Sequence, residues 1–172
     1  AGDAFIALRG ARHDGAAYVD EAARRGARVV LFEQGGPDDL ASTATLAAIG
    51  VSRLGERISD IAGRFYGAPS ESMAVIGVTG TDGKTTTSNL IYKILVAAGL
   101  KAGMISTVNA VIGDEVLDTG FHVTTPDAHD VQNYLARMVA AGITHVVLET
   151  TSHGWAQYRV DACEFDIGVV TN

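Results

Sequence analysis

The stretch VIGVTGTDGKTTT at residues 75–87 constrains the fold of this chain more than any other. The apolar, β-branched run over 74–79 predicts a buried strand. Gly80 and Gly83 follow it, and glycine lets the backbone adopt positive φ or approach a ligand closely. Lys84 then starts a predicted helix that runs to residue 98 and ends at a glycine. The expected buried stripe of this helix is Leu90, Ile91, Ile94, Leu95 and Ala98.

The junction between this strand and this helix is a predicted anion site, because a helix N-terminus offers free N–H groups and a positive dipole end. Gly83-Lys84-Thr85 at that point fits the phosphate-binding P-loop, whose lysine reaches the terminal phosphates and whose hydroxyl residue ligates Mg²⁺. The strict form of the pattern has glycine at position 78, where this chain has Val78. A glycine turn followed by a surface lysine is the plainer alternative.

Composition narrows the classes of function. The chain has 172 residues and is 47% hydrophobic, which predicts a packed globular protein of one domain or slightly more. Its formal charge of −7 argues against non-specific nucleic-acid binding, which needs a basic surface. The single cysteine, Cys163, excludes an internal disulfide and is expected to be a small packing residue. No apolar run approaches roughly 18 residues, so we expect no membrane span.

Residues 1–70 predict a small α/β domain. Strands over 4–8 and 28–32, with a polar loop at 10–15 and a helix at 16–25 between them, are expected to form a βαβ unit. Apolar residues at helical spacing predict an amphipathic helix over 51–66. The segment 67–72 breaks this periodicity and is expected to link the first domain to a second domain over 71–172.

Residues 71–172 predict a P-loop domain with a Rossmann-like, mostly parallel sheet, because strands and helices alternate. Further strands are expected over 101–106, 143–148 and 166–171, and a hairpin is expected to turn at Gly113-Asp114. A helix is expected from Thr124-Thr125-Pro126 to about residue 141, with a threonine as its cap. Its expected buried residues are Leu135, Met138 and Val139. The predicted fold class is therefore α/β.

Polar residues follow the strand over 143–148. Glu149 stands at its carboxyl end, and ligand sites in open α/β sheets lie beyond the carboxyl ends of strands. An acid beside a P-loop can hold the Mg²⁺ of a nucleotide, or it can be an ordinary solvated acid. Residues 150–153 form either a site loop or a strand-to-helix turn. Arg159 can bind a carboxylate or phosphate or remain solvated, and Thr124 and Thr125 can serve a ligand or cap a helix.

Together these residues resemble the Mur ligases, the ATP-dependent peptide ligases of bacterial cell-wall precursor synthesis. GTDGKT over 80–85 is similar to the family's G-T-[NKD]-G-K-[ST] loop, which does not require glycine at position 78. ETTSH over 149–153 is similar to the family's E-V-S-S-H segment. Matches over 2–8, 64–70 and 124–126 point to the member that adds the third amino acid of the stem peptide.

The resemblance implies a site. Its ATP-binding residues would be Gly80, Thr81, Asp82, Gly83, Lys84, Thr85 and Thr86. Lys84 would be catalytic by countering charge on the transferred γ-phosphoryl group, and Glu149 would be catalytic by holding Mg²⁺ together with Thr85. The UDP-N-acetylmuramoyl dipeptide would contact Ala11, Arg12, His13, Thr124, Thr125, Ser152, Gln157 and Arg159. In the family reaction the substrate carboxylate becomes an acyl phosphate, which the amine of an amino acid attacks.

The same resemblance implies a cytoplasmic enzyme with ATP and Mg²⁺ as cofactors, small-molecule substrates, and no nucleic-acid or protein partner. The chain departs from the family pattern at Asp82, whose charge lies near the phosphates, and at Thr150, whose hydroxyl replaces an apolar group. Thr171-Asn172 is similar to the start of the family's T-N-x-x-x-D-H segment. The rest of that segment, the adenine-binding part and the family's third domain are absent from these 172 residues. The resemblance therefore implies an incomplete central domain, and we expect an inactive fragment of an active ligase. Two alternatives are a nucleotide-binding module without ligase activity and a ligase related to folylpolyglutamate or cyanophycin synthetase.

Overall fold

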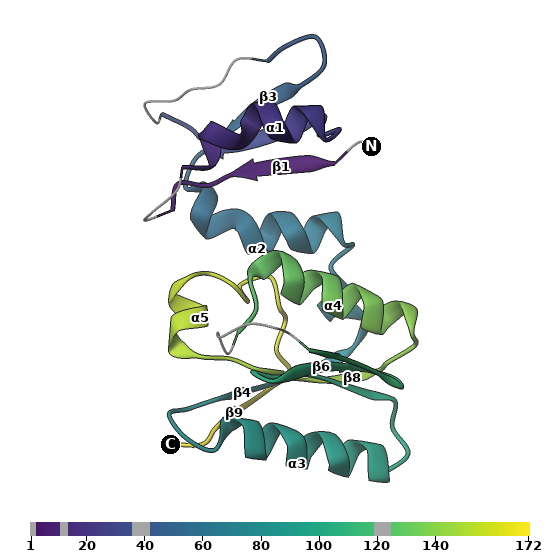
Figure 1. Cartoon of the computed structure of the whole chain (residues 1–172). Helices are drawn as coiled ribbons and strands as arrows, with labels where there is room; N and C mark the ends of the chain where they lie inside the picture. The colour runs from purple at the N-terminus through teal and green to yellow at the C-terminus, as the bar shows by residue number, and fades with distance from the viewer. Residues whose placement is uncertain (1–2, 11–13, 36–41, 119–124) are drawn as a thin grey trace. The chain divides into compact units, whose positions relative to one another are not determined.

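The computed structural model describes residues 3–10, 14–35, 42–118 and 125–172. The chain forms two compact units, Ala1–Arg57 and Ile58–Asn172, each with its own sheet (Figure 1). The division falls within α2 (Leu54–Phe65), whereas the sequence predicts a domain boundary after residue 70, which stays a prediction. None of the helices in the described ranges combines the length and the apolar character needed to cross a membrane.

The first unit is built on a parallel sheet of three strands in the order β1-β2-β3. The strands are β1 (Ala4–Ala7), β2 (Val29–Glu33) and β3 (Ala47–Val51). The 3₁₀ turn η1 (Gly15–Tyr18) and helix α1 (Val19–Arg24) connect β1 to β2, which confirms the predicted βαβ unit. Val30 and Phe32 alternate along β2 and pack with Ala7, Ala27 and Leu46 in the core of this unit.

Two predictions for the first unit are wrong in detail. The helix expected over 16–25 is divided between η1 and α1. The helix expected over 51–66 begins at Leu54, and Val51 instead ends β3. The β3 sequence AAIGV is rich in alanine and glycine, which are weak strand formers, so no strand was predicted there. The Glu33 carboxylate accepts hydrogen bonds from the backbone N–H groups of Arg53 and Leu54, at 2.7 Å each, and so caps the start of α2.

The second unit contains a six-stranded sheet in the order β7-β6-β5-β8-β4-β9. Its strands are β4 (Ala74–Thr79), β5 (Ala102–Ile105), β6 (Asn109–Ile112), β7 (Glu115–Asp118), β8 (His145–Glu149) and β9 (Ile167–Val170). The 3₁₀ turn η2 (Pro69–Ser72) precedes β4. Strands β5, β8, β4 and β9 pair in parallel, whereas β6 pairs antiparallel with both β5 and β7. The mostly parallel sheet and the hairpin at Gly113-Asp114 are therefore confirmed.

Helices cover both faces of this sheet: α3 (Lys84–Ala97) lies on one face, and α4 (Ala128–Ala140) lies on the other (Figure 1). Neighbouring residues of β4 point to opposite faces, so Val75 belongs to the core under α4 and Ile76 to the core under α3. The expected stripe of α3 is partly wrong, because Leu90 and Ile94 are 59% and 57% exposed and Ala98, the C-cap, is also exposed. Ile91 and Leu95 of the expected stripe pack against the core under α3, and Tyr92 packs beside them.

Helix α4 differs from expectation at its start and on its buried face. Its N-cap is Asp127 rather than a threonine, and the Asp127 side chain makes no capping hydrogen bond. Leu135 and Met138 are fully buried, but Val139 is exposed. Cys163 is buried in the core under α4, as predicted, and Gln132 donates to its sulfur. Burial raises the pKa of the Cys163 thiol to about 12, so it remains a neutral packing group.

Candidate functional site

The predicted P-loop connects β4, which ends at Thr79, to α3, which begins at Lys84. Gly83 has φ of +77° and is the N-cap of α3, while a side chain at Gly80 would collide with the Thr171 hydroxyl. Val78 has a fully buried side chain in the core under α3, so glycine at this position would leave a cavity. The two loop glycines therefore serve different needs, and the valine that departs from the strict pattern has a packing role.

Glu149, the last residue of β8, lies beside the start of α3. Its carboxylate is 1% exposed and accepts a hydrogen bond from the Thr85 hydroxyl, which is 3.1 Å from each carboxylate oxygen. Thr107, just beyond β5, donates to the same carboxylate through its hydroxyl at 2.9 Å and its backbone N–H at 3.4 Å. The structure therefore brings together the two residues predicted to hold a metal ion and adds a third.

The Thr85–Glu149 pair fits Mg²⁺. This ion prefers oxygen ligands and is commonly held by one or two carboxylates together with phosphate oxygens and water. In the described part of the chain the donors to Glu149 are neutral hydroxyl and amide groups, and a carboxylate withdrawn from water without a cation is costly. No cluster of three or more His, Cys, Asp or Glu in those ranges could hold a metal by itself. The pair would therefore bind the ion jointly with a phosphate ligand.

A short helix whose bounds the sequence did not predict, α5 (Ser152–Ala156), follows Glu149 after two threonines. Thr151 is its N-cap and accepts a hydrogen bond from the backbone N–H of Gly154 at 3.0 Å. Thr125 is 1% exposed, and its hydroxyl accepts from the backbone N–H of Thr151 at 3.1 Å. A side chain at Gly154 would collide with Thr125. Residues 150 and 151 thus form a strand-to-helix turn, residues 152 and 153 begin α5, and Thr125 holds this turn to the segment before α4.

Arg159 connects several predicted substrate residues. Its guanidinium donates to the backbone carbonyl of Thr125 and to the side-chain carbonyl of Gln157, the latter at 2.9 Å. It also lies 3.4 Å from the carboxylate of Asp127. The Arg159 side chain is 15% exposed, whereas Ser152 and Gln157 are exposed. The arrangement offers a positioned cation beside exposed polar groups, which can bind an anionic ligand.

Thr150 explains one departure from the family pattern. Its hydroxyl accepts a hydrogen bond from the indole N–H of Trp155 at 3.1 Å, and its backbone N–H donates to the carbonyl of Val78 at 2.8 Å. Trp155 also packs against Phe165, with ring centroids 5.3 Å apart. The polar atom at position 150 is therefore paired with a side chain that holds α5 onto β8.

Four predicted substrate residues, Ala11, Arg12, His13 and Thr124, lie outside the described residues. The described residues on either side of the 11–13 segment are hydrogen-bonded to each other. Arg9 donates to the Asp14 carboxylate at 3.0 Å, and the N–H of Gly15 donates to the carbonyl of Leu8 at 2.8 Å. Hydrogen bonds from the Ala16 backbone and from Arg9 lower the pKa of Asp14, so this carboxylate stays charged near neutral pH.

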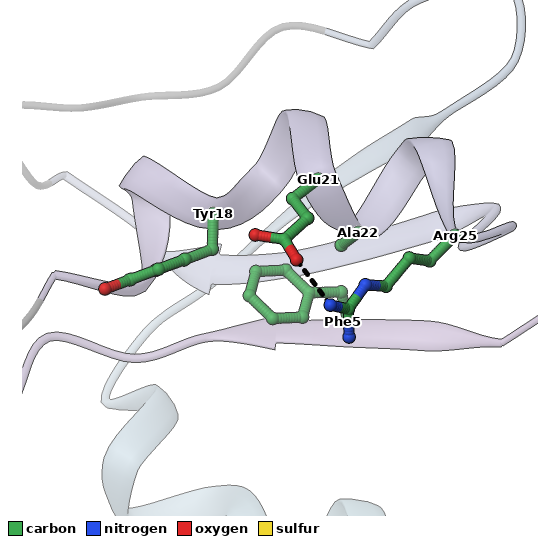
Figure 2. Close-up of a pocket in the computed structure, with 5 residues that line it drawn as sticks. All are labelled: Phe5, Tyr18, Glu21, Ala22 and Arg25. Carbon is green, nitrogen blue, oxygen red and sulfur yellow. Dashed lines mark ion pairs between the residues drawn. The ribbon is translucent and has the colours of Figure 1, made fainter.

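The first unit also has a pocket of about 300 Å³ between β1 and α1. Figure 2 shows the rings of Phe5 and Tyr18 in it, with the Glu21–Arg25 ion pair (2.6 Å) across it. Ala22 completes the described lining. None of these residues was predicted to contact a ligand.

Sequence reasoning missed Thr107, Trp155 and Asn172, all of which contact predicted site segments. Thr107 follows a strand that was predicted, so the strand-end rule that selected Glu149 would also have found it. The Asn172 side chain accepts hydrogen bonds from the N–H groups of Thr81 and Asp82, at 2.7 and 3.0 Å. This contact depends on β9 lying beside β4, which the motif alone does not reveal.

Comparison with protein families assigns the two parts of the chain. A model described as the Mur ligase middle domain matches residues 78–172, and a model described as the Mur ligase family, catalytic domain, matches residues 1–66. The chain belongs to the Mur ligase family. The resemblance deduced from its motifs is thereby confirmed.

Two curated Mur ligases illustrate the similarity. UDP-N-acetylmuramoyl-L-alanyl-D-glutamate–2,6-diaminopimelate ligase of Pseudomonas aeruginosa is 43% identical over 172 residues. UDP-N-acetylmuramyl-tripeptide synthetase of Deinococcus radiodurans is 42% identical over 172 residues. Each match covers 99% of this chain and 34% of the relative, so the chain spans about a third of the length of these relatives.

Solved structures of Mur ligases share the fold. One of a UDP-N-acetylmuramoyl-L-alanyl-D-glutamate–2,6-diaminopimelate ligase matches with a TM-score of 0.80 and 27% identity, covering 99% of this chain and 33% of the other. A MurF ligase from Thermotoga maritima, solved in complex with ADP, matches with a TM-score of 0.63 and 21% identity, covering 98% and 34%. These matches confirm the predicted Rossmann-like α/β class.

The Thr150–Trp155 contact predicts a stability effect. Thr150→Val restores the family's residue, yet we expect it to lower the free energy of unfolding by about 1 kcal/mol, because the indole N–H loses its acceptor. Urea unfolding followed by the emission of Trp155, the only tryptophan, measures this change in the second unit. The exposed Thr144→Val is the control, with an expected effect below about 0.5 kcal/mol. A Thr150→Val variant as stable as wild type would contradict the assigned role.

Proposed function

We propose that this chain supplies the phosphate-binding part and the nucleotide-sugar-binding part of an ATP-dependent amide ligase. The proposed reaction adds an amino acid to UDP-N-acetylmuramoyl-L-alanyl-D-glutamate in peptidoglycan precursor synthesis, in the cytoplasm. The observation that carries the proposal is the buried contact between Thr85 of the P-loop and Glu149, within a chain of the Mur ligase family. The names of relatives at 42–43% identity support the choice of substrate.

The proposed chemistry has two steps. In the first, the γ-phosphoryl group of ATP moves to a substrate carboxylate oxygen, which forms an acyl phosphate and ADP. In the second, the amine of the amino acid attacks the acyl carbon, the C–O bond to phosphate breaks, and an amide and inorganic phosphate result. Both steps depend on holding charged groups close together, which is the task of positioned cations and N–H donors.

For the first step, the P-loop over residues 80–86 would hold the phosphates of ATP, with the first-turn N–H groups of α3 as the donors. Lys84 begins α3, and its ammonium donates to the carbonyl of Thr81 at 2.9 Å, so it already lies over the loop. From there it would counter negative charge on the γ-phosphoryl group. Thr85 and Glu149 would hold Mg²⁺, which would neutralise charge that develops between the phosphates. Thr107 would orient Glu149.

For substrate binding, Arg159 would pair with an anionic group of the dipeptide nucleotide, and Ser152 and Gln157 would add neutral hydrogen bonds. Thr125 is buried, so it would act mainly by holding Thr151 and Arg159 in place. Thr124 and the segment Ala11, Arg12 and His13 complete the proposed set, the latter for the UDP group.

The phosphate site is tested by the affinity for MgATP. We expect Lys84→Ala to weaken binding by at least about tenfold, because a charged hydrogen bond to phosphate contributes about 1.5–3 kcal/mol. Isothermal titration calorimetry measures the change. Lys93→Ala, which removes an exposed lysine further along α3, is the matched control and should stay within about twofold of wild type. Equal affinity for both variants would remove Lys84 from the site.

The nucleotide-sugar site is tested with UDP-N-acetylmuramoyl-L-alanyl-D-glutamate as titrant. Arg159→Ala and Arg159→Lys should both weaken its binding, by about tenfold or more for alanine, while MgATP affinity changes by less than about twofold. Arg137→Ala, which breaks only the partly exposed pair with Glu115 (2.7 Å), is the control. A wild-type chain that binds MgATP but not the dipeptide nucleotide would favour a nucleotide-binding module or a ligase with another substrate.

A further inference from the structure

Asn172 lies two residues beyond the end of β9, and its side chain contacts the P-loop. Its side-chain oxygen accepts hydrogen bonds from two successive backbone N–H groups, those of Thr81 at 2.7 Å and Asp82 at 3.0 Å. Both donors are N–H groups, so the amide must present its oxygen and not its nitrogen to the loop. One side chain thus satisfies two donors of an exposed segment that has no helix or strand hydrogen bonds of its own.

Thr171 strengthens the same contact. Its backbone N–H donates to the carbonyl of Thr79 at 2.9 Å, which continues the parallel pairing of β9 with β4. Its hydroxyl lies 2.6 Å from the carbonyl oxygen of Asp82 and can donate to it. The absence of a side chain at Gly80 leaves the space that the Thr171 hydroxyl occupies. The two residues that follow β9 therefore contact the loop through both donors and acceptors.

These contacts divide the N–H groups of the P-loop into two sets. Those of Thr81 and Asp82 already have an acceptor in Asn172. Those of Lys84, Thr85 and Thr86 lie in the first turn of α3, where a helix provides no internal acceptor. An anion at this helix N-terminus could bind the second set and also the Lys84 ammonium, which here donates to the carbonyl of Thr81.

We infer that Asn172 is a positioning residue for phosphate binding: it holds residues 81 and 82 so that the first-turn N–H groups of α3 remain available to the phosphates. The inference rests on the proposed nucleotide-binding function. It also assigns a role to Asp82, whose backbone N–H and carbonyl both contact the residues that follow β9. A competing reading, in which the Asn172 oxygen occupies a phosphate position, has the opposite consequence for affinity.

The test uses the whole chain with Asn172→Ala, Asn172→Asp and, as a control in α4, Asn133→Ala. Amide hydrogen exchange without nucleotide reports the contact, and calorimetry with MgATP reports affinity. Asn172→Ala should speed exchange at Thr81 and Asp82 and weaken MgATP binding about fivefold to tenfold, the loss expected for two hydrogen bonds that order the loop. Asn133→Ala should change neither.

Asn172→Asp separates geometry from charge. The carboxylate still accepts both hydrogen bonds, so exchange at Thr81 and Asp82 should remain slow, while MgATP binding weakens at low salt and recovers at high salt. MgATP affinity that is unchanged or increased in Asn172→Ala would overturn the inference. A wild-type chain that binds no MgATP would instead overturn the proposed function. That outcome is recognisable because the exchange difference between wild type and Asn172→Ala would persist.

Discussion

The parallel pairing of β4 with β8 on one side and β9 on the other is the constraint on which the site depends. Its register sets Val78 opposite Glu149 and Thr79 opposite Val170, so the carboxyl ends of three strands finish at the same level. Pairing of β5 with β8 adds Thr107 at the same edge. Backbone hydrogen bonds between strands thus bring residues from four distant parts of the sequence to one edge of the sheet.

The buried carboxylate of Glu149 determines which ligands this edge of the sheet can bind. Hydroxyl and amide donors from Thr85 and Thr107 orient it, and among the described residues these donors are neutral groups. The adjacent helix N-terminus favours anions, and a phosphate-bound Mg²⁺ would satisfy both demands together. The geometry is therefore best suited to moving a phosphoryl group between bound partners.

Local signals explain why β4, the loop and α3 could be predicted from the sequence, since the β-branched run, the two glycines and Gly99 each act within a few residues. The strand β3 could not be predicted, because its alanines and glycine carry little preference. Leu90 and Ile94 were placed in the core because helical spacing does not reveal how wide a stripe the sheet covers. Of the two partners of Glu149, Thr85 was predicted and Thr107 was not. The Asn172 contact depends on packing between segments that are distant in the sequence. The Trp155 contact depends on α5, whose bounds were not predicted.

Binding of phosphates and Mg²⁺ at the carboxyl edge of the second sheet can be measured directly. The most direct measurement is a titration of the ¹⁵N-labelled chain with ADP, with and without Mg²⁺, followed by amide chemical shifts. We expect the largest changes in amide chemical shift at residues 83–86, and additional changes that depend on Mg²⁺ at Thr107 and Glu149. No saturable shift, or shifts confined to Phe5, Tyr18 and Arg25 in the pocket of the first unit, would contradict this expectation.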